Sequence, residues 1–368
     1  MIGVDDLRDL KERVAGRRPP LLSVYLNVNP GNPENRNRAY VIRLKDALRE
    51  EGVPKGFAGE VVGYVEELRP RMRTLVLFSS PEGWREVRWL GVELPEEVFW
   101  GEPYVAPLDL AVDEYAPVGV VVVDAKRVRL LVSSLGSLEE ELKEANVFDT
   151  AGWREITLSP SSASPQGGMA HDLFERRVEE WVRRFYKRAA GEVGDHVKSL
   201  GLRRLILAGP EERTAEFVAE LPREVKDLVA ARIHLPQDVS EGELARRISE
   251  TEEEIERSEE SELLRELRER GVRGLEETLR ALDEGRIYRV AVPWPLPDEI
   301  SWCDSCGVAL AAGHERCPYC GGPVRTRRLA NALSGLAASR GASVEFVRGE
   351  NARALREELG GIAGLPRF

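Results

Sequence analysis

Stretches with strand periodicity alternate with stretches of helical periodicity along the chain, which predicts an α/β protein. In a first unit, residues 1–107, the pattern of residues 21–28 indicates a strand that is closed by turn residues, and a helix is expected through residues 40–44. Residues 74–78 and 84–90 have the pattern of two further strands. The first unit is therefore expected to combine a sheet with helices.

A strand buried on both faces is expected near the start of a second unit, residues 108–239. Residues 118–124 form a nearly continuous run of valine, which is typical of such a strand. A second strand is predicted at residues 128–132, and a third follows a long helix over residues 169–200, at residues 205–210. Because strand, helix and strand come in this order, a doubly wound sheet is expected.

The predicted long helix has an apolar side and a basic side. Its apolar residues recur at helical spacing and are expected to face the sheet: Leu173, Phe174, Val178, Trp181, Val182 and Phe185. Six cationic residues repeat on the opposite side: Arg176, Arg177, Arg183, Arg184, Lys187 and Arg188. Such a stripe is suited to binding RNA phosphates. Alternatively, its members form ion pairs within the helix with Glu175, Glu179 and Glu180. The sequence leaves both interpretations open.

A densely charged segment, residues 240–271, separates the second unit from a third. Its sparse apolar residues favour a solvated helical linker. The third unit, residues 272–368, opens with an amphipathic helix and a strand at residues 287–292, and it continues after the cysteines with a helix over residues 328–340 and a strand at residues 343–347. Three domains suit a chain of 368 residues, which exceeds what one hydrophobic core usually organises.

All four cysteines of the chain lie in two C-x-x-C pairs, Cys303 with Cys306 and Cys317 with Cys320. This spacing lets four thiolates converge tetrahedrally on one Zn²⁺, which predicts a zinc ribbon over residues 301–325. A site closed by four thiolates has no open coordination position, so the zinc is expected to be structural and not catalytic.

Two alternatives to the zinc ribbon concern the same cysteines. The pairs can stay reduced without a metal, whereas a redox role is disfavoured because neither pair follows a strand of a thioredoxin-like unit. His314 lies in the loop between the pairs and is at most a substitute ligand. The chemistry of the protein is therefore expected to lie elsewhere.

The formal net charge of −11 excludes a basic coat over the whole surface but allows local basic patches. The polar cluster at residues 35–38 is interpreted as a solvated helix start, with a nucleic-acid contact as the alternative. No apolar run is long enough to cross a bilayer, and the first residues lack the pattern of a signal peptide. Because four paired cysteines also suit a reducing interior, a soluble cytoplasmic protein without a membrane partner is expected.

Two C-terminal segments and the middle unit resemble one protein family. Residues 360–368 are similar to the G-G-I-x-A-x-L-R-Y ending of archaeal and eukaryotic class-I peptide chain release factors and their relative Pelota, and residues 274–285 resemble the opening of the third domain of these factors. The resemblance implies an RNase-H-like middle domain and a third domain that is a kink-turn-binding ribosomal-protein-like α/β sandwich with an inserted zinc ribbon. The first unit is more similar to the bacterial–archaeal release-factor-like branch, the Balon-type ribosome factors.

The same resemblance assigns a role to the loop before the long helix. The family's catalytic motif is G-G-Q; here Gly167 and Gly168 match, and Met169 takes the place of the Gln. Glycines without a Cβ fit a crowded RNA cavity, a backbone N–H there can stabilise an oxyanion, and the family's Gln helps to place water. Met169 keeps the backbone contribution but not that of the side chain, for which Gln166 or His171 would have to substitute. A hydrolytic loop and an inactive Gly-rich loop therefore both stay open.

The resemblance implies a ribosomal factor. The stop-codon motif of true release factors, N-I-K-S, is absent from the first hundred residues, so we expect a factor that binds the ribosomal A site without codon reading, in rescue, protection or hibernation of ribosomes. Its implied partners are ribosomal RNA, P-site tRNA and a translational GTPase.

Two enzyme functions are the alternatives. The first is a codon-independent peptidyl-tRNA hydrolase that uses the Gly-rich loop. The second and weaker one is an RNA-processing nuclease on the RNase-H-like sheet, which requires several carboxylates around Mg²⁺. Asp124 at a strand end lacks evident carboxylate partners, and Asp109 and Asp113 are expected at turns or edges.

Overall fold

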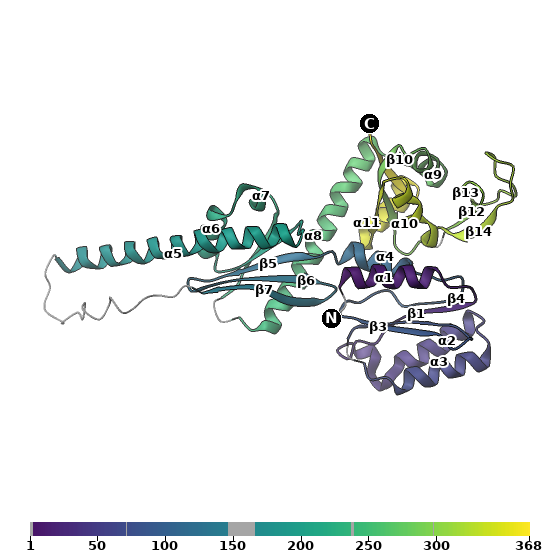
Figure 1. Ribbon diagram of the computed structural model, residues 1–368, viewed down its shortest axis with the longest axis horizontal. Coiled ribbons are helices and arrows are strands. Elements are labelled where there is room, and N and C mark those ends of the chain that lie inside the picture. Colours follow the sequence, from purple (N-terminus) through teal and green to yellow (C-terminus); the bar gives the residue numbers. More distant parts are fainter. Residues whose placement is uncertain (1–2, 71, 146–165, 237–238, 297) are drawn as a thin grey trace. The chain divides into compact units, whose positions relative to one another are not determined.

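The computed structural model of the protein describes most of the chain: residues 3–70, 72–145, 166–236, 239–296 and 298–368, with residues 145 and 166–178 described by their backbone alone. The chain forms two compact units: unit 1 comprises Met1–Ala116 together with Glu256–Phe368, and unit 2 comprises Pro117–Ile255. Each unit combines helices with sheets (Figure 1), so the predicted α/β class is confirmed. The division into three domains and a linker at the predicted boundaries stays a prediction.

Unit 1 begins with an antiparallel sheet of strand order β3-β2-β1-β4. Helices α2 and α3 lie on one side of this sheet and α1 on the other (Figure 1), where α1 contacts α4. Because both faces of β1 are covered, six of its seven residues are buried. The elements are α1 (Val4–Ala15), β1 (Leu21–Asn27), η1 (Pro33–Arg38), α2 (Ala39–Glu50), α3 (Lys55–Glu67), β2 (Thr74–Ser79), β3 (Arg85–Leu90), β4 (Glu97–Gly101) and α4 (Ala106–Glu114).

The polar cluster at residues 35–38 lies in η1, a short 3-10 helix, and not in the first turn of an α-helix. Asn35 is buried, and its side-chain amide donates to the carboxamide oxygen of Asn27 at 3.1 Å. Asn37 and Arg38 both have positive φ, a conformation that asparagine tolerates better than most residues. The interpretation as a solvated helix start is therefore wrong for Asn35.

The C-terminal part of unit 1 contains two further sheets. Strands β10-β16-β11-β15 form a mixed sheet in which only β11 and β15 run parallel, and β13-β12-β14 form a small antiparallel sheet around the cysteines. The elements are β10 (Val272–Arg273), α9 (Leu275–Asp283), β11 (Ile287–Pro293), β12 (Glu299–Cys303), β13 (Val308–Ala311), β14 (Arg325–Arg328), α10 (Leu329–Ser339), β15 (Ser343–Val347), α11 (Gly349–Leu359) and β16 (Ala363–Pro366).

Unit 2 is a five-stranded sheet of order β7-β6-β5-β8-β9, in which β7, β6 and β5 are antiparallel and β5, β8 and β9 are parallel. Helices α5 and α6 bury Phe185 and Phe217 against one face, and α8 buries Leu244 and Ile248 against the other. The doubly wound arrangement expected from the sequence is therefore present, with an antiparallel extension. The elements are β5 (Val118–Val123), β6 (Arg127–Ser134), β7 (Ser137–Ala145), α5 (Gln166–Ser199), β8 (Leu205–Gly209), α6 (Glu211–Glu220), α7 (Arg223–Lys226) and β9 (Val229–His234).

The segment predicted as a charged linker is helix α8 (Glu241–Arg270), which contributes to both units. Its first half belongs to the core of unit 2, and its second half buries Leu263, Leu264 and Leu267 in the core of unit 1. Each such leucine contributes roughly 1.5–3 kcal/mol by burial, so α8 is a core helix and not only a solvated one.

Among the helices that the structure describes, none combines the length and the apolar character of a membrane span.

Gly209 at the end of β8 provides a test of the sheet in unit 2. Its φ is +148°, and a Cβ there would lie 2.2 Å from the carbonyl oxygen of Val123 in β5. A Gly209→Ala substitution must push these parallel strands apart, so we expect the free energy of unfolding to fall by more than about 2 kcal/mol.

Gly191→Ala is the matched control, because Gly191 lies in α5 with no neighbour within 4 Å of an added Cβ. It is expected to raise the free energy of unfolding by roughly 0.5–1 kcal/mol. Urea unfolding followed by circular dichroism measures both changes. Equal unfolding midpoints for the two variants would contradict the strand spacing described above.

Candidate functional site

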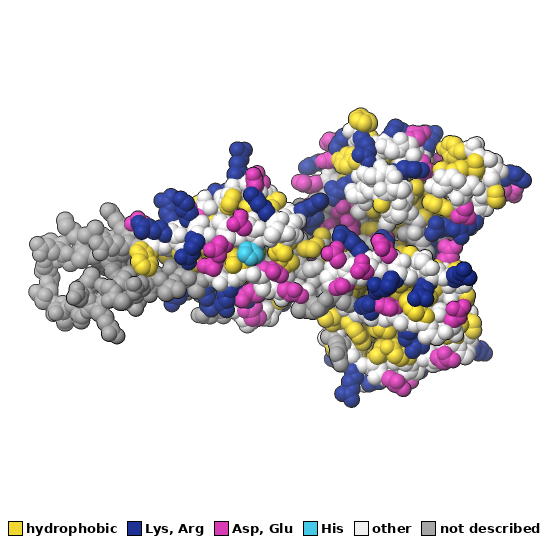
Figure 2. Space-filling view, viewed as in Figure 1, with side chains coloured by type: hydrophobic (Ala, Val, Ile, Leu, Met, Phe, Trp, Pro, Cys, Tyr) yellow, Lys and Arg dark blue, Asp and Glu magenta, His cyan; other side chains and the backbone are white. Residues whose placement is uncertain are grey.

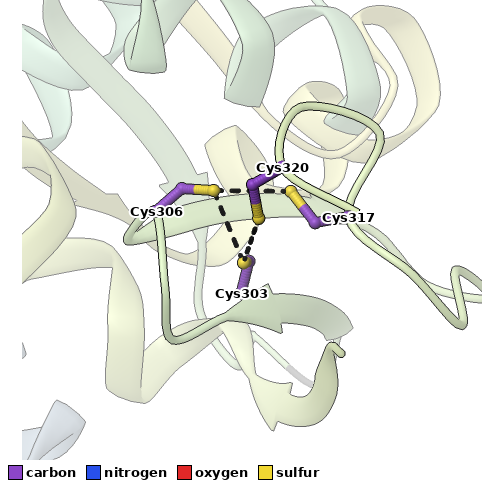
Figure 3. Close-up of side chains that lie close together, drawn as sticks. All are labelled: Cys303, Cys306, Cys317 and Cys320. Atoms are coloured by element: carbon purple, nitrogen blue, oxygen red, sulfur yellow. Dashed lines mark hydrogen bonds between the residues drawn. The ribbon is translucent and has the colours of Figure 1, made fainter. Parts of the chain in front are cut away.

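Four thiols converge in the small antiparallel sheet of unit 1 (Figure 3). The sulfur atoms of Cys303, Cys306, Cys317 and Cys320 all lie within 4.8 Å of one another, and three of the pairs are 3.5 to 3.6 Å apart. In a tetrahedral site with Zn–S bonds of about 2.3 Å, the sulfurs would be about 3.8 Å apart. The observed spacing is therefore compatible with one zinc ion held by four thiolates.

Two matching backbone turns bring the thiols together. After each C-x-x-C pair a glycine N–H donates to the carbonyl of the first cysteine, from Gly307 to Cys303 at 2.9 Å and from Gly321 to Cys317 at 2.8 Å. Both glycines have positive φ, 64° and 71°, which residues with a Cβ rarely adopt. The local sequence of each pair therefore specifies its own half of the cluster.

Hydrogen bonds within the cluster differentiate its thiols. The backbone N–H of Cys306 lowers the pKa of the Cys303 thiol to about 7, and hydrogen bonding to Cys320 raises the pKa of Cys306.

The side chain of His314 is exposed and does not belong to the group of potential ligands. Its backbone instead exchanges hydrogen bonds with the hydroxyl of Ser301, at 3.2 and 3.3 Å.

Arginines of β14 connect the thiol-bearing sheet to the first sheet of unit 1. Arg325 and Arg327 lie 3.2 and 3.7 Å from the carboxylate of Glu102. The guanidinium of Arg328 lies 4.3 Å from the ring centroid of Phe99 in β4. Cation–π contacts contribute about 0.5–1 kcal/mol at exposed sites and surface ion pairs less than about 1 kcal/mol. Several weak contacts together therefore join residues far apart in the sequence.

The Gly-rich motif lies at the beginning of α5. The helix starts at Gln166, so the backbone of Gly167, Gly168 and Met169 is in its first turn, three residues before the predicted start. Their side chains belong to the stretch 166–178, which is described by its backbone alone. The role assigned to these three residues stays a prediction.

Part of each predicted face of the long helix lies in the same stretch. Leu173, Phe174 and Val178 of the apolar side, and Arg176 and Arg177 of the basic side, have side chains outside the described residues. The helix backbone continues through all of them, as the predicted long helix requires. Their orientation stays a prediction.

The other four members of the basic stripe have described side chains, and all are exposed: Arg183, Arg184, Lys187 and Arg188. Figure 2 shows Lys and Arg side chains in dark blue on the surface of unit 2. Arg184 pairs within the helix with Glu180 at 2.5 Å, which is one of the predicted intrahelical partners. Arg183 and Arg188 pair with carboxylates of α6 and β7 at 3.0 and 3.5 Å. Surface pairs of this kind are worth about 0–1 kcal/mol, so these guanidinium groups can exchange a carboxylate for a phosphate at small cost.

The apolar side of α5 differs from the prediction at one residue. Val182 and Phe185 are buried as expected, but Trp181 is 37% exposed. Tyr186 occupies the core instead, with its ring edge-on to Phe217 at 5.6 Å. Because successive residues of a helix are rotated by about 100°, a buried stripe through Val182, Phe185 and Tyr186 leaves Trp181 at its margin.

Asp124 follows β5, where a nuclease would place a metal ligand, but its carboxylate serves the turn into β6. It accepts the backbone N–H groups of Lys126 and Arg127 at 2.6 and 2.8 Å. Within the described part of the chain, the four cysteines are the only group of three or more side chains that could hold a metal. The carboxylate site of a nuclease therefore gains no support from these residues.

Two carboxylates expected at turns or edges lie in α4. Asp109 pairs with Lys11 of α1, and the carboxylate of Asp113 accepts the backbone N–H of Phe346 at 2.7 Å. The prediction for both residues is wrong. The sequence signal was their spacing of four residues, which puts them on one side of a helix that is otherwise apolar.

Sequence reasoning also missed two buried glutamates of α8. Glu256 and Glu260 are 3% and 0% exposed. Their spacing, continued by Leu263 and Leu267, places them on the side of the helix that faces the core of unit 1. The dense charge of the segment concealed that pattern.

Comparison with known families bears on the middle of the chain. Residues 103–253 match the family described as bacterial archaeo-eukaryotic release factor family 10. Residues 103–253 belong to the release-factor superfamily. The resemblance to release factors and Pelota stated from the sequence is thereby confirmed. This release-factor-like stretch spans the described strands and helices of unit 2, from β5 to Glu253 of α8, and it also includes α4 of unit 1.

Solved structures of several translation factors resemble the chain. An archaeal translation termination factor, aRF1, is 17% identical with a TM-score of 0.26, and the match covers 100% of this chain and 99% of that one. Pelota from Archaeoglobus fulgidus is 17% identical with a TM-score of 0.34, covering 99% and 92%. Dom34 from S. cerevisiae, a translation termination-like factor, is 10% identical with a TM-score of 0.44, covering 80% and 79%. A search of curated proteins found no match.

Proposed function

We propose that this protein is a ribosome-associated factor of the release-factor type that binds the ribosomal A site without reading a codon. The observation that carries the proposal is the match of residues 103–253 to a release factor family. That stretch contains α5, whose described basic residues extend into solvent. Since the N-I-K-S motif is absent from the first hundred residues, stalled or idle ribosomes are the proposed target, in rescue, protection or hibernation.

The sheet of unit 2 supports the RNase-H-like assignment of the middle domain. Across this sheet the strands follow the order third, second, first, fourth, fifth of the unit, with the first three antiparallel and the last two parallel to the first. Helices cover both faces. For the C-terminal part of unit 1, the mixed sheet with helices α9, α10 and α11 supports the proposed α/β sandwich of a kink-turn-binding type.

Helix α5 would present its basic side to ribosomal RNA. Arg183, Lys187 and Arg188 lie within two turns, and the ion pairs of Arg183 and Arg188 are on the surface. Each phosphate that replaces such a carboxylate releases condensed counterions and makes binding more salt-dependent. RNA contacts along α5 would carry the Gly167–Gly168 turn at the beginning of the helix toward the acceptor end of a P-site tRNA.

Partners beyond the ribosome are proposed from the release-factor resemblance. They are P-site tRNA and a translational GTPase that delivers the factor. Among the solved structures, Dom34 is described as interacting with Hbs1 and an archaeal Pelota as ribosome-bound with ABCE1. A ribosomal partner would place this protein in the cytoplasm.

In the thiol cluster we propose a structural Zn²⁺, held by Cys303, Cys306, Cys317 and Cys320. Four thiolates leave no position for a substrate, so the ion would hold the ribbon and its three-stranded sheet together.

Elemental analysis of the purified protein is expected to find about one zinc per chain. Cys306→Ser is expected to lower the zinc content and the melting temperature, whereas the neighbouring Ser305→Ala should change neither. Normal zinc content in the Cys306→Ser variant would contradict the four-thiolate site.

Reversal of charge on α5 tests the interaction with RNA. In the triple variant Arg183→Glu, Lys187→Glu and Arg188→Glu, we expect binding to 70S ribosomes to weaken on the order of tenfold or more. The slope of log affinity against log salt should become shallower by roughly one unit for each phosphate that is no longer neutralised. Co-sedimentation at increasing salt measures both quantities. Lys198→Glu, at the other end of the same helix, is the control and should bind like the native protein. Unchanged binding of the triple variant would rule out this RNA interaction.

Peptide release distinguishes a binding factor from a peptidyl-tRNA hydrolase. With Met169 in place of the family Gln, we expect the native protein to release labelled peptide from stalled ribosome complexes at a rate on the order of a hundredfold or more below that of Met169→Gln. Gly168→Ala serves as the control for a loop-dependent reaction. If the native protein releases peptide efficiently and the Gly168→Ala substitution abolishes this release, the protein is a hydrolase and not only a binding factor.

A further inference from the structure

Unit 1 contains a group of five carboxylates with little or no exposure, here called the carboxylate cluster: Asp113, Glu114, Glu256, Glu260 and Glu345. They come from three elements, α4, α8 and β15. Glu260 is fully buried, and the side chain of Glu114 is 6% exposed. Because burying a charge is costly unless it is paired, the partners of these groups decide how the cluster behaves.

Arg257 and Arg348 connect the carboxylates of α4 and α8. Arg257 pairs with Glu114 and lies 2.7 Å from Glu260, and the Arg348 guanidinium lies 3.3 Å from Glu114. Glu260 also accepts the backbone N–H of Arg348 and the side-chain amide of Asn351, each at 3.0 Å. The carboxylate of Glu260 is thus held by donors from α8 and from the start of α11.

The remaining carboxylates lie against β15. Glu345 accepts two hydrogen bonds from Arg289 of β11, at 3.2 and 2.5 Å. Asp113 accepts the backbone N–H of Phe346, and no ion pair of its carboxylate is present among the described residues. Glu345 and Asp113 therefore share a region from which solvent is largely excluded, with Arg289 as the neighbouring cation.

Three arginines, Arg257, Arg289 and Arg348, form ion pairs with Glu114, Glu260 and Glu345. Asp113 has no ion pair within the described part of the chain. Burial raises the pKa of Glu260 to about 7, and burial together with the charge of Glu345 raises the pKa of Asp113 well above its usual range. The folded protein therefore retains protons here that an unfolded or opened chain would release.

The cluster also lies where the chain passes between the two units. The first segment of unit 1 ends at Ala116, two residues after Glu114, and the second segment begins at Glu256. The pair of Arg257 with Glu114 joins these two segments directly. A change in the cluster therefore acts on both segments of unit 1.

We propose that the carboxylate cluster is a proton-dependent latch, which holds α4 and the second half of α8 against β15 and the start of α11 as long as it keeps its excess protons. The groups that face one another in the latch are Asp113 and Glu114 of α4, Glu256, Arg257, Glu259 and Glu260 of α8, Arg289 of β11, Glu345 of β15, and Arg348 and Asn351 at the start of α11.

The direction of the pH dependence follows from linkage. A carboxyl whose pKa is raised in the closed state binds its proton more tightly there than in the open state, so raising the pH favours opening. The stabilisation is complete below the ordinary carboxyl pKa of about 4, and it is lost as the pH rises through about 7 for Glu260 and through the raised pKa of Asp113. In that window each proton released on opening increases the opening constant up to about tenfold per pH unit.

Hydrogen exchange of the full chain tests the latch. Exchange at pH 5.5, 6.5 and 7.5, corrected for intrinsic rates, is expected to show an opening constant for residues 106–114 and 256–270 that rises on the order of tenfold per pH unit. Asp113→Asn and Glu260→Gln, which cannot release these protons, should each reduce that rise. Asp283→Asn is the control, because Asp283 is another carboxyl with a raised pKa, paired with Arg340 and away from the cluster.

The outcomes separate a latch from a purely structural cluster. If the native chain shows no pH-dependent opening in these segments, or if Asp283→Asn removes the dependence as well as the cluster variants do, the proposal is overturned. Should a variant fail to fold, calorimetric unfolding of the native chain in buffers of different ionisation enthalpy still decides. Release of about one or more protons on unfolding at pH 6.5 supports the latch, and no release contradicts it.

Discussion

Helix α8 has to satisfy two hydrophobic cores with a sequence that is mostly charged, and much of the structure depends on how it does so. Leu244 and Ile248 close one face of the sheet in unit 2, and Leu263, Leu264 and Leu267 close the C-terminal sheet of unit 1. Between these stretches the helix buries Glu256 and Glu260. Buried carboxylates do not stabilise a core by themselves, so the arginines and amide groups around them are as necessary as the leucines.

The two candidate sites depend on structure at different ranges. In the thiol cluster, each C-x-x-C pair forms its own glycine-terminated turn, and tertiary structure only has to bring two finished halves together. The basic side of α5 is also specified locally, by helical spacing. The ion pairs of this basic side are not specified locally, because Arg183 and Arg188 pair with carboxylates of α6 and β7 that are distant in the sequence.

The limits of prediction are visible in individual elements. β5, with its run of valines, and the long helix α5 were predictable because burial on one side or both leaves a clear periodicity. Strand β7 was not predictable from the sequence. It is an edge strand with the sequence SLEEELKEA, and it carries the charges that protect a sheet edge. Trp181 was predicted to face the sheet but lies at the margin of the buried stripe, because helical spacing defines a stripe but not its margins.

By itself, the sequence determined the α/β class, the four-cysteine cluster, the doubly wound sheet and the release-factor resemblance, since each of these is encoded in periodicity or in short motifs. Only the tertiary structure decided that residues 1–116 and 256–368 share one unit and that acidic residues of α4, α8 and β15 meet in its interior. The physical reason is that the free energy of a buried charge depends on donors from other elements. The spacing of residues within a charged helix does not show which donors the other elements supply.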